Sequence, residues 1–206
     1  MARDRQSIVK MSRREGYALH PKAHKVLIKR PGIPGEHGNA GGYAGRSSQY
    51  ALQLREKQKV KRLYGLLERQ FANLMKEAAR RKGQSGETLL QMLEQRLDNT
   101  IYRSGLAVSR RAARQLVTHG HFTLNGTRID IPSIRLRPGD TLKLREHSKN
   151  SHYFKNIDEV SPAPTTIPSW LKVNRTKFEV SVQSLPTRDD AEPDINEQLI
   201  VEYYSR

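Results

Sequence analysis

The sequence predicts an α+β protein with a basic irregular N-terminal arm, a helical domain, and a module of two helices followed by a small twisted antiparallel sheet. Glycine and proline interrupt the first 46 residues, apolar residues then recur at helical spacing, and short alternating runs joined by turn sequences come after them. Only 35% of the residues are hydrophobic, which favours several small cores over one large core.

The arm shows no helical or strand period, and glycines and prolines are dense between Pro31 and Gly45. Basic residues are threaded through it. We expect it to order on a phosphate backbone, because glycine permits close approach while lysine and arginine neutralise phosphate charge. A disordered solubilising tail is the alternative, and composition alone does not separate the two.

Helical spacing begins at residue 47. In 47–83, apolar residues recur three and four apart, Ser47 or Ser48 is a candidate cap, and Gly65 is expected to divide the segment into two helices. The pattern continues through apolar residues four apart at 89–101.

Ser109 is then expected to cap a short helix that ends at Gly120. Its three arginines fall on the face opposite its apolar residues: Arg110, Arg111 and Arg114. Because no acidic residue occurs between positions 99 and 129, we expect this face to be exposed and strongly basic.

Turn sequences organise the chain after Gly120. Asn125-Gly126 between two alternating runs predicts a tight hairpin, and a second turn at 137–140 leads into a strand. Residues 146–169 are expected to be a linker, and a further strand is expected at 177–184.

Net charge is +16, and its distribution along the chain is uneven. Counting lysine and arginine against aspartate and glutamate, residues 1–62 carry +11, 96–145 carry +7 and 146–206 carry −3. Such charge favours polyanionic partners, so the nucleic-acid surface is expected on the arm and on 96–145.

Several classes of protein are disfavoured. There are no cysteines, which excludes disulfides and thiolate zinc sites and fits a reducing compartment such as a cytoplasm. The sequence shows no apolar run of membrane-spanning length and no secretory signal, and it lacks a phosphate-binding GxxxxGK[ST] loop. We expect no enzymatic activity, cofactor or small-molecule substrate.

The block RLDNTIYRSGLAVSRRAARQLVTHGHFTLNGTRIDIPSIRLRPGDTLKLR at 96–145 resembles the RNA-binding module named after ribosomal protein S-four. The flanks SSQYALQLREKQKVKRLYGLLERQF, KGQSGETLLQMLEQRLDN and DINEQLIVEYYSR resemble the helices and C-terminus of that ribosomal family, and RREGYAL and PGIPGEHG resemble its arm. The resemblance covers essentially the whole chain. It implies an arm at 1–46, a helical domain of 47–95 with a return segment at 146–206, and the RNA-binding module between them.

The resemblance implies a structural protein of the small ribosomal subunit. Such a protein binds 16S-type ribosomal RNA early in assembly, at a helix junction in the 5′ domain. It contacts ribosomal protein S-five, where the interface affects decoding accuracy. It lines the mRNA entry channel with S-three and S-five. The lack of a transit peptide favours synthesis in the compartment of use; cytoplasmic ribosomes are expected, with plastid ribosomes as the alternative.

The candidate RNA-binding residues are cations and short polar groups of the arm, the first long helix and the module. They are Arg13, Arg14, Lys22, Lys25, Arg30, Arg46, Arg55, Lys59, Arg62, Arg96, Asn99, Arg103, Ser109, Arg110, Arg111, Arg114, Gln115, His119, His121, Asn125 and Arg128. The C-terminal match implies a protein-partner interface at Glu197, Tyr203, Tyr204 and Arg206.

Two positions depart from the family pattern. Many members bind zinc through four cysteines in the arm, whereas here Ser12 stands where one cysteine lies and the others are absent. His20, His24 and His37 remain, but hydrogen bonding to phosphate or water is the expected role, and no metal site is predicted. Val180 replaces a common glycine, which suggests a more regular strand there.

The same module occurs in tRNA synthetases, pseudouridine synthases and a heat-shock RNA chaperone. An enzyme needs a catalytic domain for which the remaining residues leave no room, and the chaperone lacks the long helical flanks. A membrane-surface protein needs a basic amphipathic helix whose apolar face is left uncovered, whereas the apolar stripe at 60–78 is expected to have core partners.

Overall fold

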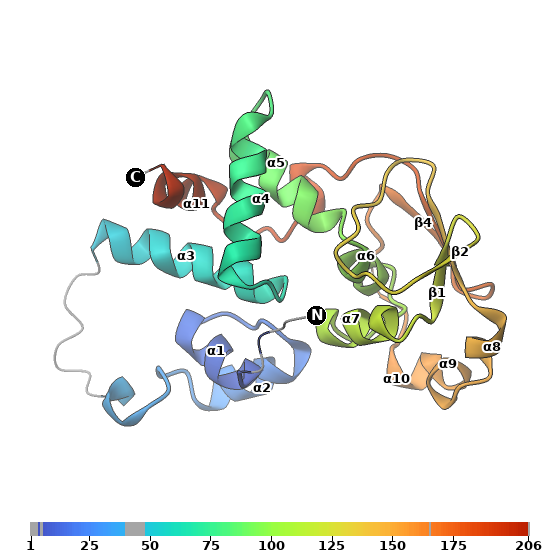
Figure 1. The fold of residues 1–206 in the computed structure, drawn as a ribbon. Coiled ribbons are helices and arrows are strands. Elements are labelled where there is room, and N and C mark those ends of the chain that lie inside the picture. The colour runs from blue at the N-terminus through green and yellow to red at the C-terminus, as the bar shows by residue number, and fades with distance from the viewer. Residues whose placement is uncertain (1–3, 5, 40–47, 165, 206) are drawn as a thin grey trace. The chain divides into compact units, whose positions relative to one another are not determined.

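The computed structural model of the protein describes residues 4, 6–39, 48–164 and 166–205. The chain divides into two compact units, Met1–Leu89 with Asp194–Arg206 (unit 1) and Leu90–Pro193 (unit 2) (Figure 1). Arg46 and Arg206 lie outside the described residues, and the side chain of His37 is not described.

Unit 1 is helical in the part that the structure describes. Its elements are α1 (Ile8–Glu15), α2 (Pro21–Lys29), the short 3-10 helix η1 (Glu36–Asn39), α3 (Gln49–Leu63), α4 (Glu68–Arg80), the first part of α5 (Ser85–Glu94) and α11 (Glu197–Tyr204).

The expectation that the arm has no regular structure is wrong for its first thirty residues, which contain α1 and α2. The dense glycines and prolines begin only at Pro31. Upstream, Gly16 ends α1 in a left-handed conformation at φ 63°, and Pro21 is the first residue of α2. The His20 ring accepts the backbone N–H of Lys22 at 3.1 Å. This ring therefore caps a helix.

The prediction that Gly65 divides 47–83 into two helices is confirmed by α3 and α4. Gly65 has φ 65°, and the Ser48 hydroxyl caps α3 by accepting the N–H of Ala51 at 3.2 Å. The C-terminal helix α11 packs along α3, where Gln53 donates to Glu202 at 2.7 Å. The two ends of unit 1 are thereby joined.

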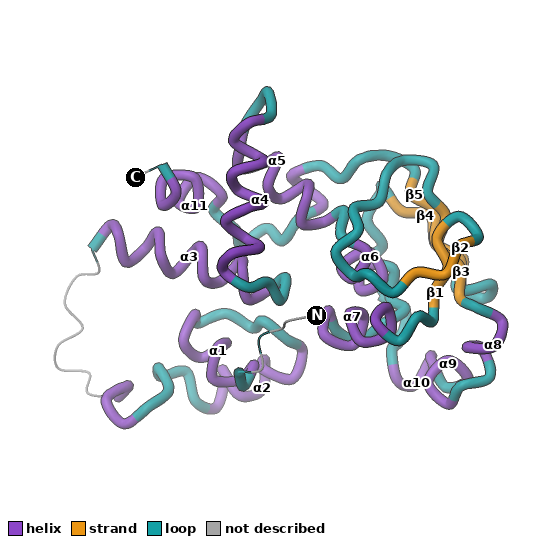
Figure 2. Tube along the Cα trace, viewed as in Figure 1, coloured by secondary structure: helices purple, strands orange, loops and turns teal. Residues whose placement is uncertain are grey.

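Unit 2 combines helices with a sheet whose strands are orange in Figure 2. Its elements are the end of α5, α6 (Leu97–Arg103), α7 (Arg110–Thr118), β1 (Phe122–Leu124), β2 (Thr127–Ile129), β3 (Thr141–Leu144), α8 (Glu146–Lys149), α9 (His152–Lys155), α10 (Ile157–Val160), β4 (Leu171–Asn174), β5 (Glu179–Val182) and the 3-10 helix η2 (Arg188–Asp190).

The sheet is antiparallel throughout, with strand order β2-β1-β3-β5-β4. The predicted hairpin is confirmed, since Leu124 pairs with Thr127 across Asn125-Gly126, whose φ angles of 49° and 87° fit a tight reverse turn. Alternation then aims Leu142 and Leu144 at the helices and Lys143 at solvent.

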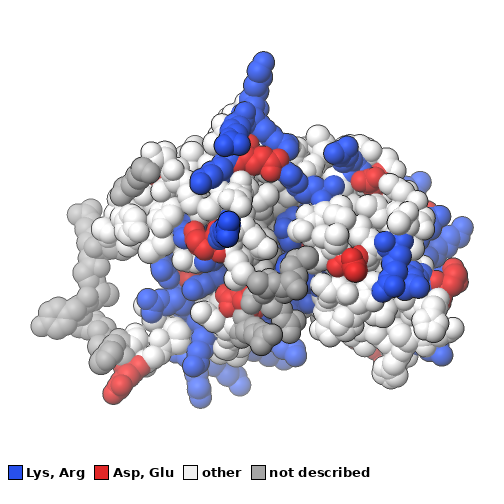
Figure 3. Space-filling model, in the orientation of Figure 1, with Lys and Arg blue, Asp and Glu red and all other residues white. Residues whose placement is uncertain are grey.

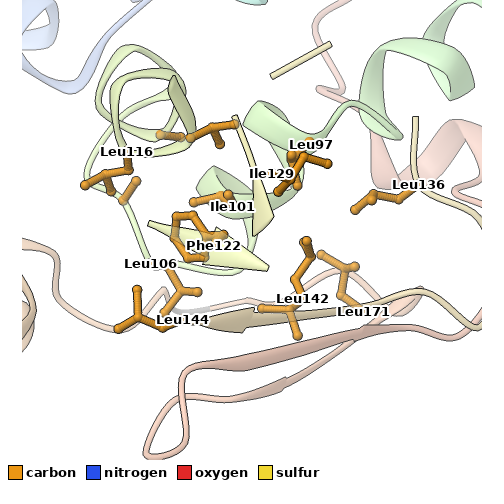
Figure 4. Close-up of a cluster of buried hydrophobic side chains, with 14 of the residues drawn as sticks. Leu97, Ile101, Leu106, Leu116, Phe122, Ile129, Leu136, Leu142, Leu144 and Leu171 are labelled. Carbon is orange, nitrogen blue, oxygen red and sulfur yellow. The ribbon is translucent and has the colours of Figure 1, made fainter. Parts of the chain in front are cut away.

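The core of unit 2 lies between the sheet and α6 and α7. Figure 4 shows Leu97 and Ile101 from α6, Leu116 from α7, and Phe122 and Leu142 from the strands gathered in one cluster. All of these side chains are at least nine-tenths buried. This core holds α7 on the sheet and fixes which of its side chains face outward.

Residues 146–169 are not a plain linker, contrary to expectation. They form the three short helices α8, α9 and α10, and Phe154 and Ile157 belong to the main core of unit 2. The predicted strand at 177–184 is confirmed as β5, in which Val180 is fully buried and pairs with Leu142 of β3. Because β5 pairs with β3, residues 146–193 belong to the same unit as residues 96–145. Residues 194–206 belong instead to unit 1.

The spacing of the apolar residues at 89–101 fits one continuous helix. The structure instead divides this segment between α5 and α6. At the break, Leu97 donates its N–H to the carbonyl of Ile134 at 2.8 Å, and Leu136 donates to Gln95 at 2.9 Å. Hydrogen bonds from a segment about forty residues away thus replace those that a continuous helix makes.

Candidate nucleic-acid interface

Helix α7 carries the central part of the candidate interface. The Ser109 hydroxyl accepts the N–H of Ala112 at 3.2 Å, which confirms the predicted cap. Ala113, Leu116 and Val117 are buried in the core. On the opposite side, three exposed side chains occur at four-residue spacing: Arg111, Gln115 and, just after the helix, His119.

The other two arginines of this helix are largely covered, so the expectation of a wholly exposed triple-arginine face is wrong. The Arg110 and Arg114 side chains are 12% and 11% exposed. Arg114 donates to Asp98 at 3.2 Å, and Arg96 binds the same carboxylate through two hydrogen bonds of 3.1 and 2.9 Å. Asp98 therefore neutralises charge on two predicted phosphate-binding arginines.

A second group of ion pairs lies beside the first. Arg103 donates to both oxygens of Glu94 at 3.0 and 2.8 Å. Asn99 donates to the same Glu94 at 2.7 Å and accepts from Arg110 at 2.9 Å. Arg110 in turn pairs with Glu192 at 2.9 Å. We call Glu94, Arg96, Asp98, Asn99, Arg103, Arg110, Arg114 and Glu192 the arginine network.

Sequence reasoning missed the three carboxylates of the arginine network. The charge count found no acid from 99 to 129, but Glu94 and Asp98 stand just before that window and Glu192 arrives from far along the chain. Asp98 could have been found, since it lies on the helix that carries Asn99 and Arg103. No local signal points to Glu192.

A cluster of cationic and imidazole groups surrounds Gly120 at the α7–β1 turn. A Cβ at Gly120 would stand 2.7 Å from Nε of Arg128, so the guanidinium lies directly against the glycine. Arg145 donates to the Gly120 carbonyl at 3.1 Å. The rings of His119 and His121 are 6.0 Å apart. We call these residues the Gly120 cluster; sequence analysis missed only Arg145, which directly follows β3.

The electrostatics of the Gly120 cluster favour an anionic ligand. Burial lowers the pKa of His121, and the nearby His119 and Arg145 lower it further. Its Nδ1 lies 3.0 Å from the Ser148 hydroxyl. The guanidinium groups of Arg128 and Arg145 at this turn attract a polyanion, and their contacts with phosphates release the counterions condensed on it.

Asn125 at the tip of the hairpin is exposed but has a local structural role. Its amide donates to Asp140 at 2.8 Å, and its carbonyl accepts the N–H of Thr141 at 2.9 Å. These bonds tie the hairpin to the start of β3.

In unit 1 the predicted cations divide into two groups. Those exposed on α1, α2 and the residue after α2 are Arg14, Lys22, Lys25 and Arg30, and Figure 3 shows basic side chains gathered over this region. The others are engaged within the unit: Arg13 donates to the Gly32 carbonyl, Arg55 and Arg62 pair with Glu15, and Lys59 pairs with Glu56.

The C-terminal tyrosines hold α11 in unit 1. Tyr204 donates to Glu68 at 2.8 Å, and the ammonium of Lys57 lies 4.7 Å from the centre of the Tyr203 ring. Burial and the bond to Glu68 raise the pKa of Tyr204. Burial alone would raise the pKa of Glu68, but hydrogen bonds from Lys57, Lys61 and Tyr204 outweigh it and lower that pKa to about 2. Glu197, in the first turn of α11, is half-buried.

The described ranges show neither a metal site nor a membrane span. Within them, no group of three or more histidine, aspartate or glutamate side chains is placed to hold a metal ion. Over the same residues, no helix combines the length and apolarity that crossing a membrane requires.

Comparison with known proteins identifies the family. Residues 3–94 match the family model described as "Ribosomal protein S4/S9 N-terminal domain", and residues 95–142 match "S4 domain". Proteins named "Small ribosomal subunit protein uS4" from Chlorobium limicola, Chlorobium phaeobacteroides and Roseiflexus sp. are 48%, 49% and 47% identical, each over the full length of both chains. The chain therefore belongs to the family of small ribosomal subunit protein uS4, whose members are structural proteins of the ribosome and not enzymes.

Proposed function

We propose that this protein binds 16S-type ribosomal RNA through two exposed basic surfaces. The first runs along α7 to the Gly120 cluster, and the second covers α1 and α2. The observation that carries the proposal is the row formed by Arg111, Gln115 and His119, which ends where Arg128 is held against Gly120. The family's RNA-binding domain covers this region.

RNA recognition here is recognition of shape. An A-form helix hides its base edges in a deep, narrow groove, so side chains contact phosphates, 2′-hydroxyls and junction geometry. Arginine suits this task because its planar guanidinium donates two hydrogen bonds to one phosphate. Residues of the arginine network bind RNA only where a phosphate replaces a carboxylate, so Arg96 and Arg114 mainly fix the position of α7.

The wider role is that of the family. The protein binds early to a helix junction in the 5′ domain and nucleates assembly of the body of the small subunit. It contacts ribosomal protein S-five through the surface that includes Glu197, Tyr203 and Tyr204, and with S-three it helps to line the mRNA entry channel. It acts on cytoplasmic ribosomes, with plastid ribosomes as the alternative.

The test measures binding of the full-length protein to a 5′-domain RNA fragment across a salt series, with tRNA as competitor. Replacing Arg111 and Arg128 by glutamine should weaken binding and lower the log–log salt slope by about 0.7–0.9 for each lost phosphate contact. Lys172→Gln is the matched control for a change of one charge, because Lys172 is exposed on β4, at the opposite edge of the sheet from β2.

Two outcomes would contradict the proposal. Equal loss of binding in Lys172→Gln and in the single variants Arg111→Gln and Arg128→Gln would mean that total charge, and not this surface, binds RNA. Complete displacement by tRNA would favour a non-specific RNA chaperone.

A further inference from the structure

We infer that Glu192 occupies the place of an RNA phosphate at Arg103 and Arg110, and that RNA must displace it before these two arginines can bind. The inference rests on the proposed RNA-binding function. Glu192 Oε1 accepts from Nη2 of Arg110 at 2.9 Å and lies 3.6 Å from Nη2 of Arg103. A phosphate oxygen accepts the same N–H groups with similar geometry.

Both arginines are held in position by other contacts than Glu192. Arg110 lies over the ring of Tyr102, with its guanidinium carbon 4.5 Å from the ring centre, and its Nε donates to Asn99 at 2.9 Å. Arg103 is fixed by two hydrogen bonds to Glu94. Removing Glu192 should therefore leave both guanidinium groups where they are.

Glu192 is the most exposed carboxylate of the arginine network. Its side chain is 21% exposed, compared with 7% for Asp98 and 0% for Glu94. It lies between η2 and α11, and the neighbouring Ala191 is buried and anchors the chain. The Glu192 side chain can thus turn toward solvent without disturbing the core, whereas the other two carboxylates cannot.

The charge of the arginine network shows what displacement achieves. Four arginines share three carboxylates in the folded unit. When Glu192 leaves, the net charge beside Arg103 and Arg110 becomes more positive by one unit. Glu192 is therefore a residue that sets how many phosphates α7 and α6 can bind, and its presence lowers the affinity of the protein for RNA.

Glu192→Gln removes the competing charge while keeping the shape of the side chain. We expect it to bind the 5′-domain RNA fragment about 1.5- to 5-fold more tightly, the range for freeing one partly exposed charge pair. The log–log salt slope should steepen by about 0.7–0.9, equivalent to one added phosphate contact.

Asp189→Asn is the matched control. It makes the same change of charge at an exposed position in the same segment. The inference requires a larger gain for Glu192→Gln than for Asp189→Asn, and loss of the extra gain when Arg110→Gln is added. Equal gains, a loss of affinity, or a gain that persists without Arg110 would each overturn it.

Folding is checked by fluorescence of Trp170, the single tryptophan, which is fully buried in unit 2. Should Glu192→Gln fold poorly, Glu192→Asp retracts the carboxylate from Arg110 while keeping its charge, and it should also bind more tightly than wild type. Failure of the proposed function has a different signature, namely wild-type binding that is weak or insensitive to salt.

Discussion

Replacing Asp98 by asparagine removes the charge that two arginines share inside unit 2. The Asp98 side chain is 7% exposed, and those of Arg96 and Arg114 are 6% and 11% exposed. Asparagine keeps one acceptor oxygen but places an N–H₂ group opposite one of the guanidinium donors. At least one guanidinium N–H of Arg96 or Arg114 then faces the amide N–H₂ instead of an acceptor, and the shared negative charge is gone.

Breaking a buried ion pair by removing one partner costs about 3–5 kcal/mol, because the remaining charge stays buried without compensation. The loss of stability in Asp98→Asn should fall within that range, since Asp98 accepts two hydrogen bonds from Arg96, one from Arg114 and one from the backbone N–H of Asn99. A typical domain is stable by only about 5–15 kcal/mol, so the loss is a large fraction of the stability of unit 2.

Urea unfolding followed by Trp170 fluorescence measures this loss of stability, because Trp170 is buried in unit 2, the unit that contains Asp98. A loss of about 4 kcal/mol at a slope of about 2 kcal/mol per molar urea lowers the midpoint by about 2 M. Glu146→Gln is the control, because Glu146 is 87% exposed and pairs only at the surface with Lys149. That variant should change stability by less than about 0.5 kcal/mol.

A midpoint for Asp98→Asn close to that of Glu146→Gln would refute the reasoning. It would mean that the arginines reach solvent or another acceptor once the charge is gone, and that Asp98 does not organise α6 and α7.

Two further predictions concern unit 1 and the Gly120 cluster. Because the pKa of Glu68 is lowered from 4.5 to about 2 on folding, its ionised form stabilises unit 1 fully above about pH 4.5, and this stabilisation is lost as the pH falls toward 2. Glu68→Gln should flatten that part of the stability–pH curve measured by circular dichroism, whereas Glu87→Gln, at an exposed position of α5, should keep it. Gly120→Ala should cost about 1–2 kcal/mol from its left-handed backbone and also weaken RNA binding by displacing Arg128. Gly126→Ala is the control, because Gly126 also has a positive φ but an added Cβ there meets no other atom. If the two variants bound RNA equally well, a role for Arg128 would be contradicted.

Where an element depends on nearby residues, sequence reasoning located it. Gly65 divides α3 from α4, Ser109 caps α7, and Asn125-Gly126 closes the hairpin. Each of these features is set by the backbone preference or the hydrogen bond of a residue within about four positions, so the sequence alone contains the cause.

Composition misled the prediction in two segments. Glycine and proline counted over the whole arm concealed α1 and α2, although Gly16 and Pro21 stand at a helix end and a helix start. Serine, asparagine and proline suggested a linker at 146–169, where Phe154 and Ile157 are buried against a core built mainly from other segments. In both cases the position of a residue mattered more than its frequency.

The sequence by itself determined the family, the α+β class and the two basic regions, whereas the exposed row of Arg111, Gln115 and His119 was seen only in the structure. Only the tertiary structure decided that Arg96, Arg103, Arg110 and Arg114 are paired with carboxylates, and that residues 171–182 complete the sheet of the RNA-binding module. The physical reason is the range of each interaction. Helix caps and turns act between neighbours, whereas Glu192 meets Arg110 across 82 positions of sequence, through a fold that no local pattern describes.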